Sequence, residues 1–209
     1  MELWSLKETY LDRFYERCGF PLQEDWVVID IGAGLGEFTL DAARHPNNRV
    51  YAYEPFGPSF ELLKANLNLN RVANVEAFQE AVAEEGGVVR LDISEPEPIK
   101  MHTVGHNENG LEVLAITLPQ IFKRHAIQLC HLLKMDCEGA EYEILFSTPP
   151  EVLARIYRIV MEYHEGAANR NHKELSNYLK NYGFEVETFA NYVHKDLGYL
   201  RAWRNEPLS

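Results

Sequence analysis

The feature that most restricts the fold is a short apolar run that ends in glycines, WVVIDIGAGLG at residues 26–36, with a helical pattern, GEFTLDAARH, directly after it. A continuous apolar run of this length is typical of a central parallel strand that is buried on both faces. The same alternation then repeats. RVYAYEP predicts a second strand, PSFELLKANLNLN a second helix with a proline in its first turn, and NVEAFQEAV a third strand. We therefore predict a parallel α/β sheet.

The rest of the chain continues this alternation less regularly. Residues 3–18 predict an amphipathic helix, and residues 95–112 predict a polar loop after a turn and short strand, EEGGVVRLDIS. EVLAITL predicts a strand, PQIFKRHA a short helix, RIYRIVMEYH a strand and HKELSNYLKNYG a helix. The last two predicted strands, FEVETFA and LGYLRAW, have a short connection, which indicates an antiparallel hairpin at the sheet edge.

Composition limits the class of protein. The 209 residues suit one globular domain, which we place at residues 25–205 after an N-terminal helical segment, residues 1–24. We expect no membrane span and no secretion signal, and three irregularly spaced cysteines favour a reducing, cytoplasmic location over a disulfide framework. The net charge of −12 disfavours a nucleic-acid partner. A homodimer stays open.

The first chemical motif is a glycine-rich turn between the first predicted strand and its helix. Gly32, Gly34 and Gly36 let the backbone turn tightly and let a ligand approach without a Cβ clash. A nicotinamide fingerprint would need glycine at position 37, where Glu37 stands. The spacing resembles motif I of class I S-adenosylmethionine (SAM) methyltransferases. That resemblance implies cofactor contacts from Asp30, Gly32, Ala33, Gly34, Gly36 and Glu37. A tight turn without a ligand is the alternative.

Polar residues at the ends of the next two predicted strands extend this interpretation. Glu54 ends the second strand, where the two oxygens of a carboxylate can accept both ribose hydroxyls of a nucleoside. Gln79 and Glu80 end the third strand, where such enzymes often contact the adenine amino group, although either could be solvated. NAD and SAM share these contacts. The glycine spacing, the single nucleotide-binding half and the terminal hairpin favour SAM, the last by analogy between folds.

A second motif, LKMDCEGAE at residues 133–141, carries a more specific signal. With the preceding strand and Thr-Leu pair, and with IVMEYHEG after it, this block resembles the signature of FkbM-type methyltransferases over roughly residues 25–190. The resemblance implies a Rossmann-like, doubly wound, mostly parallel seven-stranded sheet with a C-terminal antiparallel hairpin and an N-terminal helix. Pro119 stands where the family usually has an acid, and residues 84–112 match no part of the pattern.

The carboxyl ends of these strands are where ligands bind in open α/β sheets. Asp136, Glu162 and His164 are therefore the predicted catalytic residues, with Asp136 also beside the cofactor and His164 a plausible base because a histidine pKa lies near neutrality. We expect Glu138 to be the first residue of a helix, where the positive end of the helix dipole stabilises its carboxylate. Hard divalent cations prefer oxygen ligands such as Asp136, Glu138 and Glu162, but we expect no metal here over a metal held by these three residues. His102 and His106 are weaker candidates.

The sequence thus predicts a SAM-dependent methyltransferase that acts on a small-molecule acceptor, with oxygen as the methylated atom. A sulfonium is already an activated methyl donor, so the protein mainly aligns the nucleophile and excludes water. An RNA or protein methyltransferase and a degenerate SAM-binding interaction domain are the alternatives, and a nicotinamide dehydrogenase is more distant.

Overall fold

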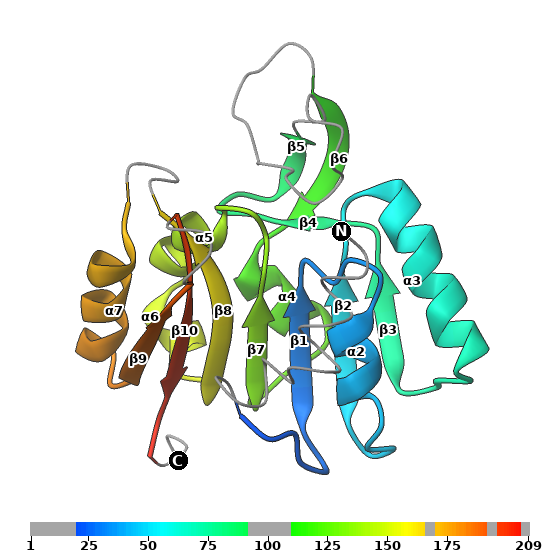
Figure 1. Ribbon diagram of the computed structural model, residues 1–209, viewed down its shortest axis with the longest axis horizontal. Coiled ribbons are helices and arrows are strands. Elements are labelled where there is room, and N and C mark those ends of the chain that lie inside the picture. The colour runs from blue at the N-terminus through cyan, green and yellow to red at the C-terminus, as the bar shows by residue number, and fades with distance from the viewer. Residues whose placement is uncertain (1–19, 92–109, 166–169, 192–195, 206–209) are drawn as a thin grey trace.

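The computed structural model describes residues 20–91, 110–165, 170–191 and 196–205. Its centre is a seven-stranded sheet in the order β3-β2-β1-β7-β8-β10-β9 (Figure 1). The strands are β1 (Val27–Ile31), β2 (Arg49–Tyr53), β3 (Val75–Phe78), β7 (Leu132–Met135), β8 (Arg158–His164), β9 (Glu185–Ala190) and β10 (Leu197–Trp203). All neighbouring pairs are parallel except those made by β10, which runs antiparallel to β8 and β9. The predicted seven-stranded sheet and C-terminal hairpin are confirmed.

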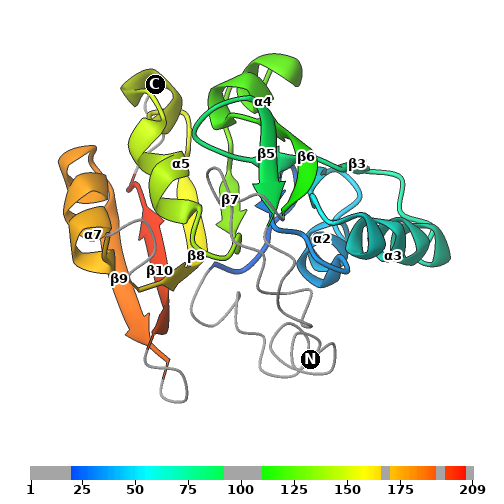
Figure 2. The ribbon, with the colours of Figure 1, turned by 90° about the horizontal axis from the view of Figure 1, so that it is seen from above.

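Helices cover both faces of this sheet, as the view from above shows (Figure 2). On one face lie α2 (Glu37–Ala42) and α3 (Gly57–Leu69), which bury apolar side chains against the sheet. On the other face lie α4 (Leu118–Arg124), α5 (Glu141–Ser147), α6 (Pro150–Leu153) and α7 (His172–Asn181). Two covered faces explain why the central strands read as continuous apolar runs.

A second, small sheet was not predicted. Its order is β4-β6-β5, formed by β4 (Ala81–Val82), β5 (Gly87–Leu91) and β6 (Leu111–Ile116). The segment NVEAFQEAV, predicted as one strand, is therefore two strands in two sheets, separated by Gln79 and Glu80. Local apolar patterning does not reveal this change of sheet, because both halves look like strands.

Three predictions fall partly or wholly outside the described residues. They are the amphipathic helix at residues 3–18, most of the polar loop at residues 95–112, and the histidines of that loop, His102 and His106. The short helix after EVLAITL is present as α4, and Thr117 caps it through reciprocal bonds with Gln120. Among the described residues no helix combines the length and the apolar character that crossing a bilayer requires.

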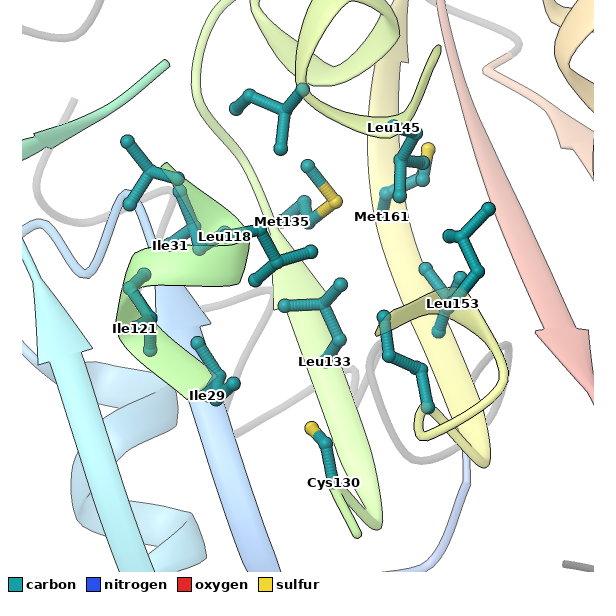
Figure 3. Close-up of a cluster of buried hydrophobic side chains, with 14 of the residues drawn as sticks. Ile29, Ile31, Leu118, Ile121, Cys130, Leu133, Met135, Leu145, Leu153 and Met161 are labelled. Carbon is teal, nitrogen blue, oxygen red and sulfur yellow. The ribbon is translucent and has the colours of Figure 1, made fainter. Parts of the chain in front are cut away.

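The larger part of the core lies between β1, β7 and β8 on one side and α4, α5 and α6 on the other (Figure 3). Leu133 is at its centre and has no exposed surface. Its neighbours in the cluster include Ile29 on β1, Ile121 on α4 and Leu153 on α6. This core fixes the position of β1 relative to β7 along the strand direction. The carboxyl ends of these two strands carry the sequence motifs.

Leu133→Ala should therefore lower the free energy of unfolding by about 2–5 kcal/mol, because it removes buried methyl groups and leaves a cavity. Leu69→Ala is the matched control: Leu69 is 80% exposed at the end of α3, so the same truncation should change stability by less than about 0.5 kcal/mol. Urea unfolding followed by circular dichroism measures both. Equal effects of the two substitutions would contradict this description of the core.

Candidate active site

The carboxyl ends of four parallel strands bring the predicted site residues to one edge of the sheet (Figure 1). The glycine turn follows β1, Glu54 follows β2, Asp136 follows β7, and His164 is the last residue of β8. Glu162 lies two residues before His164, is half-buried, and faces Tyr199 of β10 in the antiparallel register. Because the order β2-β1-β7-β8 is contiguous, residues separated by more than a hundred positions become neighbours.

The glycines of the turn do different work. Gly32 has φ +72°, and a Cβ there would lie 1.8 Å from the carbonyl oxygen of Asp136, so this position allows the two chain segments to touch. At Gly36 a Cβ would meet Leu63 of α3. Gly34 has φ +55°, and among the described residues no atom beyond its own and its two chain neighbours' lies within 4 Å of its Cβ position. The open side of the turn is therefore at Gly34, and this is where a ligand can approach the backbone.

The remaining predicted residues of the turn point inward. The Ala33 side chain is buried and packs in a cluster with Leu63 of α3. Glu37 is the first residue of α2 and only 7% exposed. The backbone N–H groups of Gly32 and Ala33 both donate to the carbonyl oxygen of Tyr53, at 3.0 Å each. These contacts hold the turn in place against β2.

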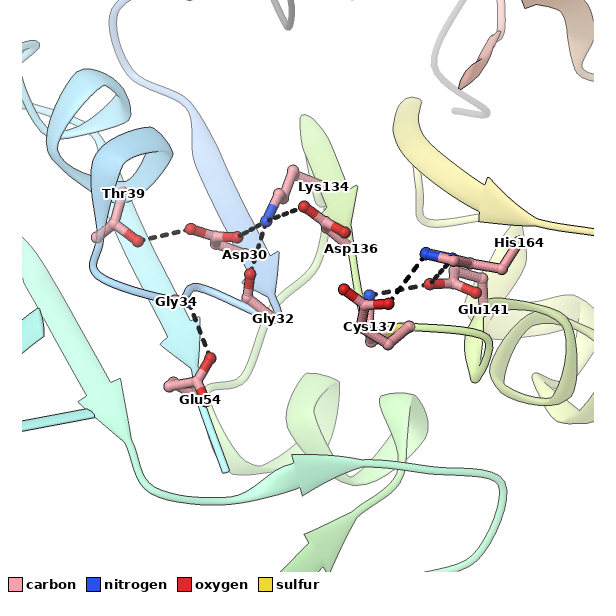
Figure 4. A network of polar contacts seen from close by, with 11 residues as sticks. Asp30, Gly32, Gly34, Thr39, Glu54, Lys134, Asp136, Cys137, Glu141 and His164 are labelled. Atoms are coloured by element: carbon pink, nitrogen blue, oxygen red, sulfur yellow. Dashed lines mark hydrogen bonds and ion pairs between the residues drawn. The ribbon is translucent and has the colours of Figure 1, made fainter. Parts of the chain in front are cut away.

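Asp30 lies below the turn and has no exposed surface. Its Oδ2 atom accepts a hydrogen bond from the Thr39 hydroxyl at 2.6 Å, and its Oδ1 atom lies 3.1 Å from the ammonium of Lys134 (Figure 4). A carboxylate in this position supports the turn and does not present itself to a ligand. The structure thus gives Asp30 two internal partners, Thr39 and Lys134, and its contact with a cofactor stays a prediction.

Glu54 supports the turn from the other side. One of its oxygens accepts the Gly34 N–H at 2.8 Å and the other accepts the Phe56 N–H at 2.9 Å. Burial raises the pKa of Glu54 to about 7, although these two hydrogen bonds oppose the shift. A carboxylate offers about four lone pairs, so acceptor capacity is left for a ligand beside Gly34.

The two predicted adenine contacts have different environments. The Glu80 carboxylate binds the Arg124 guanidinium of α4 with two bonds, of 2.5 and 3.0 Å. Gln79 is exposed and lies beside Gly57, the first residue of α3. Glu80 therefore serves to fix α4 to the β3–β4 connection, while the amide of Gln79 is accessible from solvent.

The helix after β7 begins at Glu141 and not at Glu138, so the expectation that Glu138 opens a helix is wrong. Glu138 and Gly139 have positive φ angles, +56° and +106°, and form a tight turn. A glutamate is uncommon in this left-handed region. The turn is held by the fully buried Glu141, whose carboxylate accepts the N–H groups of Cys137 and Gly139, both at 2.9 Å.

His164 lies between two carboxylates of this turn. Its Nε2 atom is 3.1 Å from Glu138 Oε2, and its Nδ1 atom is 3.6 Å from Glu141 Oε1. Burial by itself lowers the pKa of His164, but the two carboxylates outweigh it and raise the pKa from 6.5 to about 11. The near-neutral pKa expected from the sequence is therefore wrong: at neutral pH the ring is an imidazolium and is not free to accept a proton.

A metal site formed by Asp136, Glu138 and Glu162 was considered from the sequence. In the part of the chain that the structure describes, no group of three or more His, Cys, Asp or Glu side chains could hold a metal ion. Asp136, Glu138 and Glu162 thus do not form the oxygen ligand set considered from the sequence.

Two residues that organise the site were not among the predicted site residues. Lys134 is buried within the apolar β7, and Glu141 is buried at the start of α5. A signal for the first was present in the sequence, since a lysine in the otherwise apolar LLKM is costly to bury unless it is paired. Glu141 gave no such signal, because an acid in the first turn of a helix is common.

The charge of His164 gives a test by pH. A pKa of about 11 in the folded state exceeds the ordinary 6.5. The imidazolium therefore contributes its full stabilisation below pH 6.5 and loses it as the pH rises towards 11. The difference in urea-unfolding free energy between the wild type and His164→Gln should shrink over that interval. His45→Gln, at the opposite edge of the sheet before β2, is the matched histidine control. A difference that stays constant with pH would refute this assignment.

Comparison with known proteins agrees with this arrangement. The methyltransferase FkbM domain model matches residues 30–186. The chain is 30% identical to the AMB antimetabolite synthetase AmbE of Pseudomonas aeruginosa, over 86% of this chain but only 10% of that much longer protein. It is 29% identical to the 31-O-demethyl-FK506 methyltransferase FkbM of Streptomyces tacrolimicus, over 86% of this chain and 80% of that one.

A solved structure shares the fold and holds a cofactor product. A Streptococcus mutans protein in complex with S-adenosylhomocysteine (SAH) superposes with a TM-score of 0.57 at 11% identity, over 92% of this chain and 96% of that one. The domain match covers most of the chain, including both sequence motifs. The chain therefore belongs to the FkbM methyltransferase family, and S-adenosylmethionine is its cofactor.

Proposed function

We propose that this protein transfers the methyl group of SAM to an oxygen atom of a small-molecule acceptor. The observation that carries the proposal is the open backbone at Gly34 beside a carboxylate, Glu54, that retains acceptor capacity, at the edge where Asp136 also lies. The relative from Streptomyces tacrolimicus bears the name of a methyltransferase for an O-demethylated small molecule. The net charge of −12 weighs against nucleic-acid acceptors.

In this proposal the nucleoside of SAM lies along the ends of β1, β2 and β3. Its ribose hydroxyls donate to Glu54, and the adenine reaches the accessible amide of Gln79. The backbone around Gly34 accommodates the ligand, while Asp30, Gly36 and Glu37 support the turn from within. The methionyl end then points to Asp136, which is partly exposed after β7.

The acceptor would approach from the ends of β7 and β8, where Asp136, Glu162 and His164 lie. The acceptor oxygen attacks the methyl carbon, the C–S bond breaks, and its electron pair goes to sulfur to give SAH. The hydroxyl proton passes to a carboxylate of this edge, Asp136 or Glu162, because the imidazolium of His164 already holds its proton. His164 contributes positive charge that offsets the neighbouring acids.

The ribose role predicts a pH dependence of cofactor binding. Because the pKa of Glu54 is about 7 in the free protein, lowering the pH below 7 protonates Glu54 and replaces the charged acceptor of the ribose hydroxyls by a weaker, neutral one. SAH affinity should then fall by up to about 10-fold per pH unit, and binding near neutrality should release a proton. Titration calorimetry in two buffers of different ionisation enthalpy measures both effects.

Glu54→Gln should bind SAH weakly and without this pH dependence. Glu76→Gln changes an exposed glutamate on the neighbouring β3 and should retain the wild-type profile. If Glu54→Gln showed the same pH dependence as the wild type, the ribose would have to bind elsewhere.

Methyl transfer itself is tested with SAM and a panel of small hydroxylated compounds, with SAH formation and methylated product followed by mass spectrometry. We expect Asp136→Asn to lower transfer by about 100-fold or more, as is typical for loss of a positioned proton acceptor, and to leave the protein folded. A wild type that fails to bind SAH would refute the proposal. Equal turnover by wild type and Asp136→Asn would remove Asp136 from the mechanism.

A further inference from the structure

Lys134 is a buried cation that the proposed chemistry does not use. Its side chain is 4% exposed and lies on the central strand β7. Burial by itself lowers the pKa of Lys134, but the charges of Asp30 and Asp136 outweigh it and raise the pKa above its ordinary value. The ammonium is therefore charged at neutral pH. Desolvating such a group is costly, so its surroundings must account for its presence.

The ammonium contacts three groups that lie at the proposed cofactor site (Figure 4). It donates to the carbonyl oxygen of Gly32 at 2.7 Å, lies 3.1 Å from Asp30 Oδ1, and lies 3.9 Å from Asp136 Oδ2. One nitrogen atom thus contacts the strand β1 through Asp30, the glycine turn through Gly32, and the first residue after β7, Asp136. The backbone N–H of Asp136 donates to the carbonyl oxygen of Ile31 at 3.0 Å, and the ion pair with Lys134 adds a contact to its carboxylate.

The backbones above the ammonium are also in contact. The parallel register pairs Asp30 with Lys134 and Ile31 with Met135, which sets Gly32 beside Asp136. The absent Cβ of Gly32 leaves room for the Asp136 carbonyl. The glycine turn and the residue after β7 therefore approach each other as closely as the backbone permits, with Lys134 directly below them.

We propose that Lys134 is a positioning residue of the cofactor site, holding the Gly32 carbonyl and the Asp136 carboxylate in the relative arrangement that binds SAM and SAH. This inference rests on the proposed position of the cofactor at this edge. Lys134 acts through its neighbours and does not touch the methyl group. Its removal therefore weakens binding of the cation SAM and of the neutral SAH by the same factor.

The test removes the buried ion pair as a unit. Asp30→Asn combined with Lys134→Met deletes one negative and one positive charge, so the net charge stays the same and no buried charge is left unpaired. Replacing a buried ion pair in this way is often neutral for stability. We expect the double variant to unfold cooperatively with near wild-type stability, and to bind both SAM and SAH about 10-fold or more weakly, since each tenfold corresponds to about the loss of one or two hydrogen bonds.

Arg204→Met is the matched control. Arg204 is another buried cation, and it donates to the carbonyl oxygens of Ile156 and Leu153, away from the cofactor site. This variant should lose stability and keep wild-type affinity for SAH. A folded double variant that binds SAH within about 2-fold of the wild type would overturn the proposal, and so would a loss confined to SAM.

If the double variant does not fold, Lys134→Arg decides the question, because it keeps the buried charge beside Asp30. A guanidinium cannot bring one nitrogen to the three acceptors that the single ammonium joins. Weakened SAH binding by this variant supports the proposal, and wild-type affinity overturns it. A wild-type protein that itself fails to bind SAH would instead refute the proposed function, so the two failures are distinguishable.

Discussion

The contact between the carboxyl ends of β1 and β7 is the constraint on which the site depends. Gly32 permits the close approach of the two backbones, and the Lys134 ammonium holds the carboxylates and carbonyl that crowd there. The apolar core around Leu133 fixes the position of these two strands relative to each other. Packing, backbone conformation and charge therefore all act on the contact between the ends of β1 and β7. The remaining residues of the site are placed relative to this contact.

The buried acids at this edge are compensated in different ways. Asp30 is paired with the Lys134 ammonium, and Glu141 with the imidazolium of His164 and two backbone N–H groups. Glu54 accepts two backbone N–H groups, and burial raises its pKa to about 7 although these bonds and the charge of Lys134 oppose the shift. Glu54 is thus a carboxylate whose charge changes near neutral pH. Under the proposed binding mode, this pH sensitivity lies at the nucleoside end of the site.

Much of the fold could be predicted, because buried parallel strands and amphipathic helices leave clear periodic patterns. The run before Gly32 and the late hairpin identified the sheet and its reversed strand, β10, which lies next to the edge strand β9. Failures occurred where two local patterns look alike. The strand predicted at residues 74–82 divides between two sheets, and the helix expected to start at Glu138 begins at Glu141. In both places a short irregular segment replaces a regular continuation, and it contacts a residue far along the chain: Glu80 binds Arg124, and Glu138 contacts His164.

By itself the sequence determined the alternation of most strands and helices, the strand ends that carry polar residues and the family, since these depend on local patterning and on short motifs. Only the tertiary structure decided what each polar residue does. Asp30 and Lys134 face each other because β1 and β7 pair in parallel, and His164 is charged because the turn after β7 brings two carboxylates to the end of β8. A pKa or an ion pair depends on distances between residues that are remote in the chain, and those distances exist only after the sheet has formed.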